Sequence, residues 1–316
     1  MTPSPETKPL LAIVIVAFED LAALEICLAS IRESGYKNRR IIVIDNSLTD
    51  TVGEALSSMP DVEYHRTGRN IGFSRACNLG IERSLACGAA YTLMLNPDTK
   101  LDPDCLEELM RAAESLQDVG IVGGKIRYAA DPGRLWYAGG RLDYLTGVGK
   151  HFQTEDGGSV IREVTYATGC CMLIPNNVFR RVGSFKESIF MYLDDAEFCM
   201  RIRRNGCRIY YNPNAILSHA VGPGMDRRNY PDYYLYFSIR NKPLIAGGVY
   251  GLYLHGITLA LTAGKLAVYG FSPGVDSRGK KLRALLWGAW DSLFTASREE
   301  RRFPRLFSRT TGVSGG

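Results

Sequence analysis

Apolar blocks alternate with amphipathic segments along the first 115 residues, and each block fits one secondary-structure period. Residues 10–18 form an unbroken run rich in Ile and Val, which is typical of a strand buried on both faces of a parallel sheet. The apolar residues from Leu21 to Ile31 recur at helical spacing, and Gly35 ends that helix. The same alternation predicts strands at 40–44, 62–65 and 90–95, and helices that begin near 49, span 72–87, and run from an Asp102 cap to about 115.

This order of elements predicts an α/β protein with a doubly wound, mostly parallel sheet. In such sheets ligands bind at the carboxyl ends of the strands. Polar clusters follow three of the predicted strands, at 18–20, 45–47 and 96–98. Asp and Asn also favour strand-to-helix turns as caps, so a structural role for each cluster stays open. The three clusters together favour a binding site at this edge of the sheet.

The second half of the chain is less regular. Residues 139–158 are rich in Gly and polar side chains, so we expect a loop or a hairpin there. Residues 165–174 predict a strand that Pro175 ends, and another strand begins at 208–211. Between these strands, residues 190–201 form the acidic start of a predicted helix, which is the strongest chemical signal in the chain.

Three carboxylates, Asp194, Asp195 and Glu197, open this helix within four positions. In a structural interpretation, Asp194 caps the helix and Asp195 interacts favourably with its dipole. Glu197 then pairs with Arg201 one turn further on. Two adjacent Asp residues after an aromatic pair also suit a general base that is held beside a substrate hydroxyl. The residues alone support both interpretations equally.

Other features exclude whole classes of function. No G-x-G-x-x-G follows the first strand and no G-x-x-x-x-G-K-[ST] occurs, which argues against a Rossmann dehydrogenase and a P-loop NTPase. The eight cysteines form no C-x-x-C pair, so we expect buried, reduced thiols and neither a zinc ribbon nor a disulfide framework. His219 is structural by default, but beside Asp98 it could hold a divalent cation.

The order and spacing of these motifs resemble the inverting family-2 glycosyltransferases, which have a GT-A fold. The resemblance runs from about residue 10 to 241. It is carried by VIVAFED, IIVIDNSLTD, NIGFSRACNLGI, LMLNPDT, ATGCCMLIP, MYLDDAEFCMRI and SHAVGPG. The nearest subgroups are bacterial rhamnosyltransferases of cell-surface polysaccharide assembly and galactofuranosyltransferases that build galactan. The acidic helix start, followed by Tyr236, Phe237, Arg240 and Asn241, is especially similar to the latter.

The resemblance implies a donor site in the first half of the chain. Asp45 would hydrogen-bond the nucleobase, and Ala17 and Phe18 would line the base and the ribose. The residues that would line the nucleotide and the diphosphate are Asn70, Gly72, Phe73, Arg75, Asn78, Asn96 and Asp98. The resemblance therefore places the donor along the carboxyl edge of the predicted sheet.

The same resemblance implies a metal site for Mn²⁺ or Mg²⁺. Asn96-Pro97-Asp98 stands where the family carries its D-x-D, so Asp98 matches the metal-binding Asp and Asn96 replaces the first carboxylate. His219 matches a second metal ligand. A cation on the donor phosphates would offset the charge of the leaving nucleoside diphosphate, and oxygen ligands suit these ions.

The resemblance also assigns the acidic helix start. Asp195 matches the catalytic base, and Asp194 would position the acceptor together with Tyr192 and Glu197. The implied reaction is a single displacement with inversion at the anomeric carbon. Its base role parallels that in inverting glycosidases, with a sugar hydroxyl in place of water.

The C-terminal quarter differs in composition. Residues 244–264 contain no Lys, Arg, Asp or Glu, which is long enough for a membrane span. Five Gly residues and the flanking Lys242 and Lys265 favour an interfacial or protein-packed helix instead. A second helix is expected at 280–296, with two Trp residues near its apolar face.

Positive charge is concentrated in the same region. The whole chain carries a net charge of +5, but the segment from Lys265 to the end contains ten Lys or Arg and four Asp or Glu, a net of +6. A basic amphipathic segment with Trp suits the anionic cytoplasmic leaflet of a membrane. A solvated basic tail on a packing helix is the alternative, and it stays open.

These patterns divide the chain into a flexible N-terminus (1–9), a glycosyltransferase domain (10–241) and a helical, basic, membrane-associating region (242–316). The domain has a donor half (10–125) and an acceptor half (126–241). The polar N-terminus does not resemble a secretory signal, so we expect a cytoplasmic protein at the inner face of the plasma membrane. The expected partners are a UDP- or dTDP-linked sugar, a polyprenyl-diphosphate-linked glycan or polysaccharide, and an anionic membrane surface, without nucleic acid; the oligomeric state stays open.

Two rival functions remain at this point. A nucleotidyltransferase shares this kind of sheet, but it usually carries a Gly-rich basic loop after the first strand, which VAFED at 16–20 lacks. A catalytically degenerate carbohydrate-binding scaffold would fit the single carboxylate at 96–98. Among donors, galactofuranose and rhamnose are favoured, and other nucleotide sugars stay open.

Overall fold

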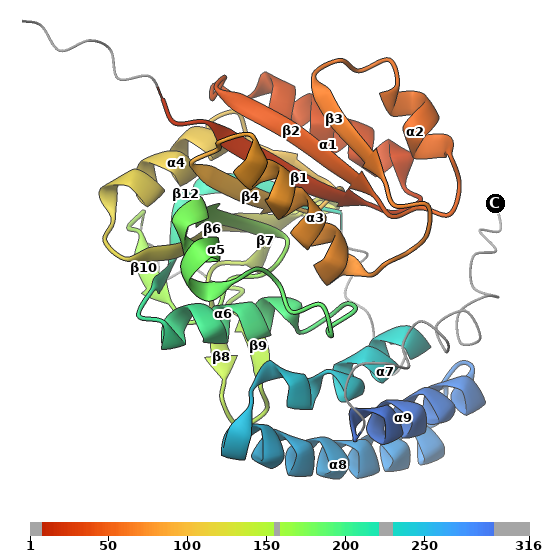
Figure 1. Cartoon of the computed structure of the whole chain (residues 1–316). Coiled ribbons are helices and arrows are strands. Elements are labelled where there is room, and N and C mark those ends of the chain that lie inside the picture. The colour runs from red at the N-terminus through yellow and green to blue at the C-terminus, as the bar shows by residue number, and fades with distance from the viewer. Residues whose placement is uncertain (1–7, 155–158, 221–229, 294–316) are drawn as a thin grey trace, which may run out of the picture.

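The computed structural model describes residues 8–154, 159–220 and 230–293 (Figure 1). Strands and helices alternate in the N-terminal half. Its elements are β1 (Leu11–Ala17), α1 (Leu21–Glu33), β2 (Arg39–Asp45), α2 (Thr51–Leu56), β3 (Val62–Arg66), α3 (Phe73–Ala86), β4 (Tyr91–Leu95), β5 (Thr99–Leu101) and α4 (Cys105–Ser115). The expected alternation is confirmed, and most of the N-terminal segment that we expect to be flexible (1–7) lies outside the described residues.

The second half adds strands first and helices afterwards. Its elements are β6 (Val119–Tyr128), β7 (Asp131–Tyr137), β8 (Gly140–Asp143), β9 (Val148–His151), β10 (Arg162–Val164), β11 (Cys171–Pro175), α5 (Asn176–Val182), α6 (Asp194–Arg204), β12 (Arg208–His219), α7 (Asp232–Arg240), the 3₁₀ helix η2 (Lys242–Ile245), α8 (Gly248–Phe271) and α9 (Arg278–Ser292). β8 and β9 form the hairpin that the Gly-rich segment predicts.

A ten-stranded mixed sheet forms the core, in the order β10-β12-β6-β11-β4-β1-β2-β3, with β5 and β7 paired at its side. Pairing is parallel along β4-β1-β2-β3 and between β6 and β12, and antiparallel on both sides of β11. Helices lie on both faces of the sheet, as α/β packing requires (Figure 1).

The register of the parallel strands brings the polar clusters to one edge. Ala17 at the end of β1 pairs with Asp45 at the end of β2, and Ile15 pairs with Leu95 at the end of β4. The segments that follow these strands therefore start side by side. The predicted binding edge of the sheet is formed by this register.

The strand predicted at 165–174 is wrong in its first half. Only Cys171–Pro175 belongs to β11. The Cys171 amide donates to the Thr168 carbonyl and so closes a turn directly before the strand. Tyr166 makes an isolated bridge to Gly140 of β8. Gly169 marks the break, because Gly within a strand pattern often indicates a bulge or a close approach. The segment before β11 is thus a loop that reaches the acidic helix.

Two further expectations concern α4 and the cysteines. The N-cap of α4 is Asp104 and not Asp102. The Asp102 carbonyl instead accepts the Cys105 amide and closes the turn before the helix. All eight cysteines are free thiols, and seven of them are buried. The expectation of reduced structural thiols is therefore confirmed.

The three last helices stack against each other below α6 (Figure 1). α7 packs closely on α9, and α9 also contacts α8. Within the described ranges, α8 is the one helix that is long and apolar enough to cross a membrane, and 17% of its most apolar window is buried inside the protein. α9 ends at Ser292 and the described residues end at 293. The later arginines of the predicted basic tail therefore lie outside the described residues.

The contact between α3 and β1 tests the core of this fold. A Cβ atom at Gly80 would lie 2.1 Å from Val14 Cγ1, so the helix can approach the strand only without a side chain there. We expect Gly80→Ala to lower the free energy of unfolding by about 1–3 kcal/mol, the usual effect of overpacking. Urea denaturation measures it.

Gly279→Ala is the matched control for this substitution. Gly279 lies in α9, and none of the described residues places an atom within 4 Å of its missing Cβ atom. Ala is the better helix former, so this variant should be as stable as the parent or slightly more stable. Equal unfolding curves for the parent and Gly80→Ala would show that the contact does not constrain the helix.

Candidate active site

The site begins where β1 and β2 end. The Asn46 amide donates to the Ala17 carbonyl at 2.9 Å, so the two strand ends stay joined past the sheet. Phe18 follows Ala17 and is 42% exposed, as expected of a residue that lines an open site. Ala17 itself is buried, so its backbone and not its side chain reaches the edge.

Asp45 is fully buried beneath this edge. Its Oδ1 accepts the Ser47 amide at 2.9 Å and its Oδ2 accepts the Tyr64 hydroxyl at 2.7 Å. Burial and the neighbouring carboxylate raise the pKa of Tyr64. Asp45 thus organises the turn after β2, and its contact with a nucleobase stays a prediction.

Asn46 holds the loop that leads into α3. Its Nδ2 donates to Asn70 Oδ1 at 2.9 Å, and its Oδ1 accepts the Ile71 amide at 3.0 Å. Gly72 follows with φ +88°, and a Cβ atom there would clash with Phe190. The Phe73 amide donates to the Phe190 carbonyl at 2.7 Å. The predicted donor loop therefore contacts the segment that precedes the acidic helix.

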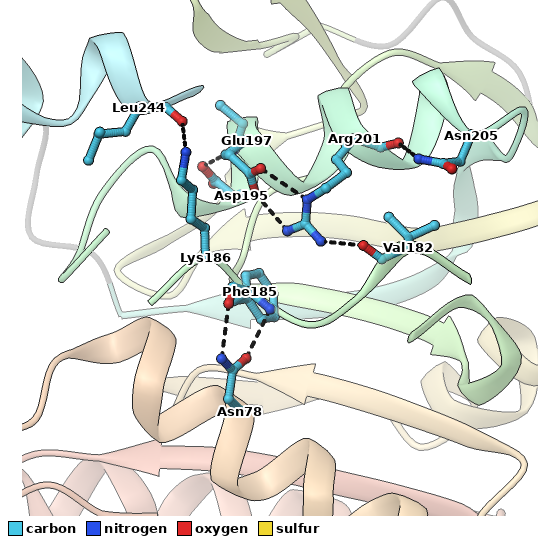
Figure 2. A network of polar contacts seen from close by, with 10 residues as sticks. Asn78, Val182, Phe185, Lys186, Asp195, Glu197, Arg201, Asn205 and Leu244 are labelled. Carbon is cyan, nitrogen blue, oxygen red and sulfur yellow. Dashed lines mark hydrogen bonds and ion pairs between the residues drawn. The ribbon is translucent and has the colours of Figure 1, made fainter. Parts of the chain in front are cut away.

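Two predicted donor residues on α3 contact the segment before the acidic helix. The Asn78 side chain forms two 2.9 Å hydrogen bonds with Phe185, one to its carbonyl and one from its amide (Figure 2). Arg75 lies 3.6 Å from Glu187. Asn78 is buried, so its observed role is to join α3 to this segment, while donor contacts of both residues stay predictions.

Asp98 and His219 come together across the sheet edge, as the sequence predicts for a metal pair. His219, the last residue of β12, lies with Nε2 2.9 Å from Asp98 Oδ1. Antiparallel pairing of β5 with β12 creates this contact, because Thr99 stands opposite His219. The Asp98 side chain is 32% exposed and the His219 side chain is 8% exposed, so the carboxylate faces the open side. Asn96 precedes it and is half-buried.

The imidazole of His219 has a restricted environment. Its Nδ1 is buried and has no hydrogen-bond partner among the described residues, and its ring packs edge-on against Trp136 with centroids 4.6 Å apart. Trp136 packs in the same way against His151 on its other side. Burial lowers the pKa of His151 and so favours the neutral imidazole there. This aromatic row continues to Tyr166, which stacks on His151.

The backbone before α6 adopts an unusual conformation. Tyr192 and Leu193 both have positive φ, at 65° and 64°, although neither is Gly. Such residues cost about 1–3 kcal/mol each and cluster at functional sites. Asn241 supports them, since its Nδ2 donates to the carbonyls of Met191 (2.8 Å) and Tyr192 (3.1 Å). Asn241, which directly follows α7, therefore supports the backbone that leads into the acidic helix.

Asp194 is the first residue of α6 and is buried. Burial raises its pKa to about 8, and the negative charge of Asp195 adds to the shift. Leu193 and not Asp194 occupies the N-cap position, and no side chain caps the helix. The capping interpretation of Asp194 is therefore wrong. At neutral pH Asp194 is a buried carboxylic acid beside a second carboxyl group.

Asp195 is held from the other side by the loop before β11. Its Oδ2 accepts the Tyr166 hydroxyl at 2.5 Å and the Gly169 amide at 3.2 Å. The next residue of that loop, Cys170, accepts the Asn96 amide at 3.0 Å. One short loop thus connects Asp195 with the segment that carries Asp98.

Glu197 faces away from this cluster. Its two carboxylate oxygens accept from Arg201 at 3.0 and 2.7 Å, and Arg201 also donates to the Val182 carbonyl (Figure 2). Glu197 is 6% exposed. The predicted helical ion pair is confirmed. A role of Glu197 in acceptor binding stays a prediction, as do the acceptor roles of Asp194 and Tyr192.

The structure adds residues that sequence reasoning missed. Asn46, Tyr166 and Gly169 each hold a predicted site residue in place. Tyr166 fits into a slot, since Cβ atoms at Gly140 and Gly149 would lie 2.7 and 2.2 Å from its ring. Gly169 inside an apolar run was the available signal, because it argues against a continuous strand.

Comparison with known proteins identifies the family of the chain. Residues 12–183 match the family described as Glycosyl transferase family 2. The chain belongs to this family. Membership favours glycosyl transfer over nucleotidyl transfer, and the site residues of the first half lie inside the matched range. The acidic start of α6 lies beyond it, so the structure alone places Asp194 and Asp195.

Relatives narrow the position of the chain within family 2. It is 27% identical over 220 residues to the low-salt glycan biosynthesis hexosyltransferase Agl10 of Haloferax volcanii. This alignment covers 66% of this chain and 67% of that protein. It is 27% identical over 234 residues to the N-acetylglucosaminyl-diphospho-decaprenol L-rhamnosyltransferase of Mycobacterium tuberculosis (66% and 75%). It is 23% identical over 212 residues to the dTDP-rhamnosyl transferase RfbF of Shigella flexneri (67% and 69%). The chain is a family-2 glycosyltransferase close to rhamnosyltransferases.

Solved structures show the GT-A fold. GalNAc-T7, solved with UDP, GalNAc and Mn²⁺, superposes with a TM-score of 0.63 at 16% identity, over 96% of this chain and 58% of that chain. The mannosyltransferase PcManGT of Pyrobaculum calidifontis, solved with GDP-Man and Mn²⁺, gives 0.56 at 15% identity, over 93% and 89%. This family-2 chain therefore spans a little over half the length of the GalNAc-T7 chain.

The protonation of Asp194 predicts how stability depends on pH. The folded pKa is about 8 and the ordinary value is 3.8, so between these values the folded state keeps a proton that the unfolded state releases. This contribution to stability is complete below the unfolded value and is lost as pH rises through about 8. Asp194→Asn cannot ionise, so its stability relative to the parent should increase as pH rises from mildly acidic to mildly alkaline.

Urea unfolding at several pH values measures this difference. Asp131→Asn is the control, because Asp131 is exposed on β7 and should leave the pH dependence of the parent unchanged. If the parent and Asp194→Asn differ by a constant amount at every pH, Asp194 is not protonated in the folded enzyme.

Proposed function

We propose that the protein transfers rhamnose or galactofuranose from a UDP- or dTDP-linked donor to a hydroxyl of a polyprenyl-diphosphate-linked glycan or polysaccharide, with inversion at the anomeric carbon. One observation carries the mechanism: the loop before β11 bonds the Asp195 carboxylate through Gly169 and the Asp98 segment through Cys170. It joins a base to the edge where the donor phosphates would lie. The relatives named as rhamnosyltransferases support rhamnose as the first donor to test.

Asp195 is the base of this mechanism. The acceptor oxygen forms a bond to the anomeric carbon, the bond from that carbon to the diphosphate oxygen breaks, and the acceptor proton passes to the Asp195 carboxylate. The nucleoside diphosphate leaves with the electron pair. Tyr166 and Gly169 fix Oδ2, so the orientation of the carboxylate is set before the acceptor arrives.

Asp194 has the complementary role. As a protonated acid beside the base, it can donate a hydrogen bond to an acceptor oxygen and adds no second negative charge. The preceding Tyr192 lies among aromatic rings, stacked near Tyr233 and edge-on to Tyr234. Aromatic faces beside a carboxylic acid suit a sugar acceptor, which has both apolar C–H faces and hydroxyl groups.

Asp98 and His219 fit a divalent cation. Their facing atoms are 2.9 Å apart, and two neighbouring ligands that are each about 2.1 Å from an octahedral ion are separated by about 3 Å. No group of three or more His, Cys, Asp or Glu side chains gathers in the described ranges, so further ligands would come from the donor phosphates and water. A bound cation would offset the charge of the leaving diphosphate. The Mn²⁺ in both structural neighbours supports this assignment.

The acceptor and the cellular location follow from the same reasoning. One relative is named for a decaprenol-linked N-acetylglucosaminyl acceptor, which supports a polyprenyl-linked glycan here. Such an acceptor is confined to a membrane, so we place the enzyme at the inner face of the plasma membrane. The basic C-terminal region would meet the anionic lipid there.

Asp195→Asn tests the base. The amide keeps the size of the side chain but cannot take the proton, so turnover should fall on the order of 10²–10⁴-fold while nucleotide affinity is retained. Release of nucleoside diphosphate from dTDP-rhamnose and UDP-galactofuranose, with a lipid-linked acceptor mixture and Mn²⁺, measures turnover. Tyr166→Phe should lower kcat less and leave the donor KM unchanged, because only the orientation of the base is affected.

Asp131→Asn serves as the control for both variants, since Asp131 is exposed on β7. Near-normal turnover in Asp195→Asn would remove Asp195 from the mechanism. If the parent releases no nucleoside diphosphate from any donor, the carbohydrate-binding scaffold becomes the better interpretation.

Asp98→Asn tests the metal pair. Loss of the charged oxygen should raise the Mn²⁺ concentration needed for half-maximal activity by about 10-fold or more. The measurement is a Mn²⁺ titration after treatment with EDTA, with the exposed Asp102→Asn as the matched control. Full activity of the parent in EDTA would show that the enzyme needs no divalent cation.

A further inference from the structure

One side of α8 is exposed over the whole length of the helix and carries no charge. Its exposed positions recur at helical spacing and include Val249, which is 84% exposed, and Phe271, which is 89% exposed. The full set is Gly248, Val249, Leu252, Tyr253, Gly256, Leu259, Ala260, Leu261, Ala263, Gly264, Ala267, Val268 and Phe271. A helix of 24 residues is about 36 Å long. An apolar surface of this length needs a partner.

The opposite side of α8 is already occupied. Its buried residues are Leu254, Thr258, Thr262 and Tyr269, which form one narrow stripe. α9 and η2 pack along the helix, and Lys281 of α9 lies over the Tyr269 ring at 5.8 Å. Among the residues that the structure describes, the helix is therefore anchored on one side only.

The exposed side of α9 is basic at its start and apolar further on. Arg278, Lys280 and Arg283 are exposed in its first two turns. Leu286, Trp290 and Leu293 follow on the exposed side, each at least 50% exposed. Basic side chains beside exposed Leu and Trp are the pattern of a helix that binds an anionic lipid surface.

The tip of the β8–β9 hairpin lies beside α8. Tyr253 donates to the Leu145 carbonyl at 3.2 Å, and Tyr250 donates to the Tyr144 carbonyl at 2.5 Å. Lys242 donates to the next carbonyl, that of Thr146, at 2.6 Å. Leu145 itself is 70% exposed. The hairpin therefore adds an apolar side chain next to the uncharged side of α8.

We propose that these groups form one lipid-docking surface, made of the exposed side of α8, the exposed side of α9 and Leu145. Its occupant is the anionic surface of a membrane, into which α8 settles parallel to the plane. A transmembrane arrangement would strip α8 from α9 and draw Lys265 into the hydrocarbon. Shallow burial of one face keeps the contacts with α9 and satisfies the apolar side.

This surface has a fixed relation to the base, and here the inference deepens the proposed function, on which this step rests. The strands that carry Leu145 also hold the Tyr166 ring, through the close approach of Gly140 and Gly149. Tyr166 in turn bonds Asp195. The β8–β9 hairpin therefore connects the proposed lipid surface with the base, and it would set the height at which a lipid-linked acceptor meets Asp195.

Flotation of the full chain with vesicles tests the surface directly. We expect the parent to bind vesicles of equal parts phosphatidylglycerol and phosphatidylcholine, and to bind phosphatidylcholine alone more weakly, with a further loss at high salt. Leu252→Glu combined with Leu259→Glu should bind about tenfold more weakly or worse, because two exposed Leu side chains lose their apolar contact. Leu145→Glu should show a smaller loss.

Val160→Glu is the matched control, since Val160 is 76% exposed outside the docking surface. It should bind vesicles like the parent, and all variants should keep the circular dichroism spectrum and the nucleotide affinity of the parent. Vesicle binding is measured without donor or acceptor, so it can succeed where sugar transfer fails, and the reverse.

Three outcomes would overturn the proposal. The parent does not float with anionic vesicles; the α8 double variant floats as well as the parent; or the double variant turns a dimer into a monomer in analytical ultracentrifugation while the parent ignores lipid. In the last case a second copy of the chain, and not a membrane, covers the face.

Discussion

Asp194 is buried directly beside the half-buried Asp195, and the ionisation of a carboxyl group in this position is the constraint on which the candidate site depends. Burial and the charge of Asp195 keep Asp194 protonated at neutral pH. The proposed acid and base roles of the two residues rest on this difference between their environments. The two left-handed residues before α6 present both side chains at the helix start, and their strain is offset by the Asn241 side chain on one side. Tyr166 and Gly169 hold Asp195 on the other side. Removing any of these supports would leave the pair free to reorient.

Backbone contacts join the two halves of the chain near this pair. Phe73 bonds Phe190 in the segment before α6, and Asn96 bonds Cys170 in the loop before β11. Backbone hydrogen bonds do not depend on side-chain identity, so the distance between the carboxyl edge of the sheet and Asp195 is set by the course of the chain. A sheet with a parallel half and an antiparallel β11 makes this geometry available, because β11 enters from the opposite direction and delivers its preceding loop to the carboxyl edge of β4.

Local patterns predicted most of the first half and the composition of the site, but not its connections. Buried strands, amphipathic helices and the polar clusters after them depend on neighbouring residues, so periodicity finds them. The pairing of Asp98 with His219 was also foreseen, from the resemblance and not from spacing, since the two residues are 121 positions apart. Tyr166 was missed because an apolar run with β-branched and aromatic residues looks like a strand throughout, and only tertiary contacts with Gly140 and Gly149 turn its first half into a loop. For Glu197 and Asn78 the structure adds hydrogen-bond partners within the protein, while their predicted ligand contacts stay predictions.

In the C-terminal region, composition alone could not distinguish a membrane-binding helix from a packed one. Sequence showed an uncharged run and a basic excess as neighbours, and both were compatible with a membrane or with a packed helix and a solvated tail. The structure separates the two sides of the run: a narrow stripe packs on α9, and the remaining surface of α8 stays apolar and exposed. Because α8 packs against α9 and η2 on one side, a helix long enough to span a bilayer can stay docked on the rest of the protein. The contact with the β8–β9 hairpin, about a hundred positions earlier in the chain, has no local sequence signal, yet it links this surface to Tyr166 and so to Asp195. The β8–β9 hairpin contacts α8 at its tip and holds the Tyr166 ring along its strands, so one element connects the exposed apolar side of α8 with the Asp195 carboxylate.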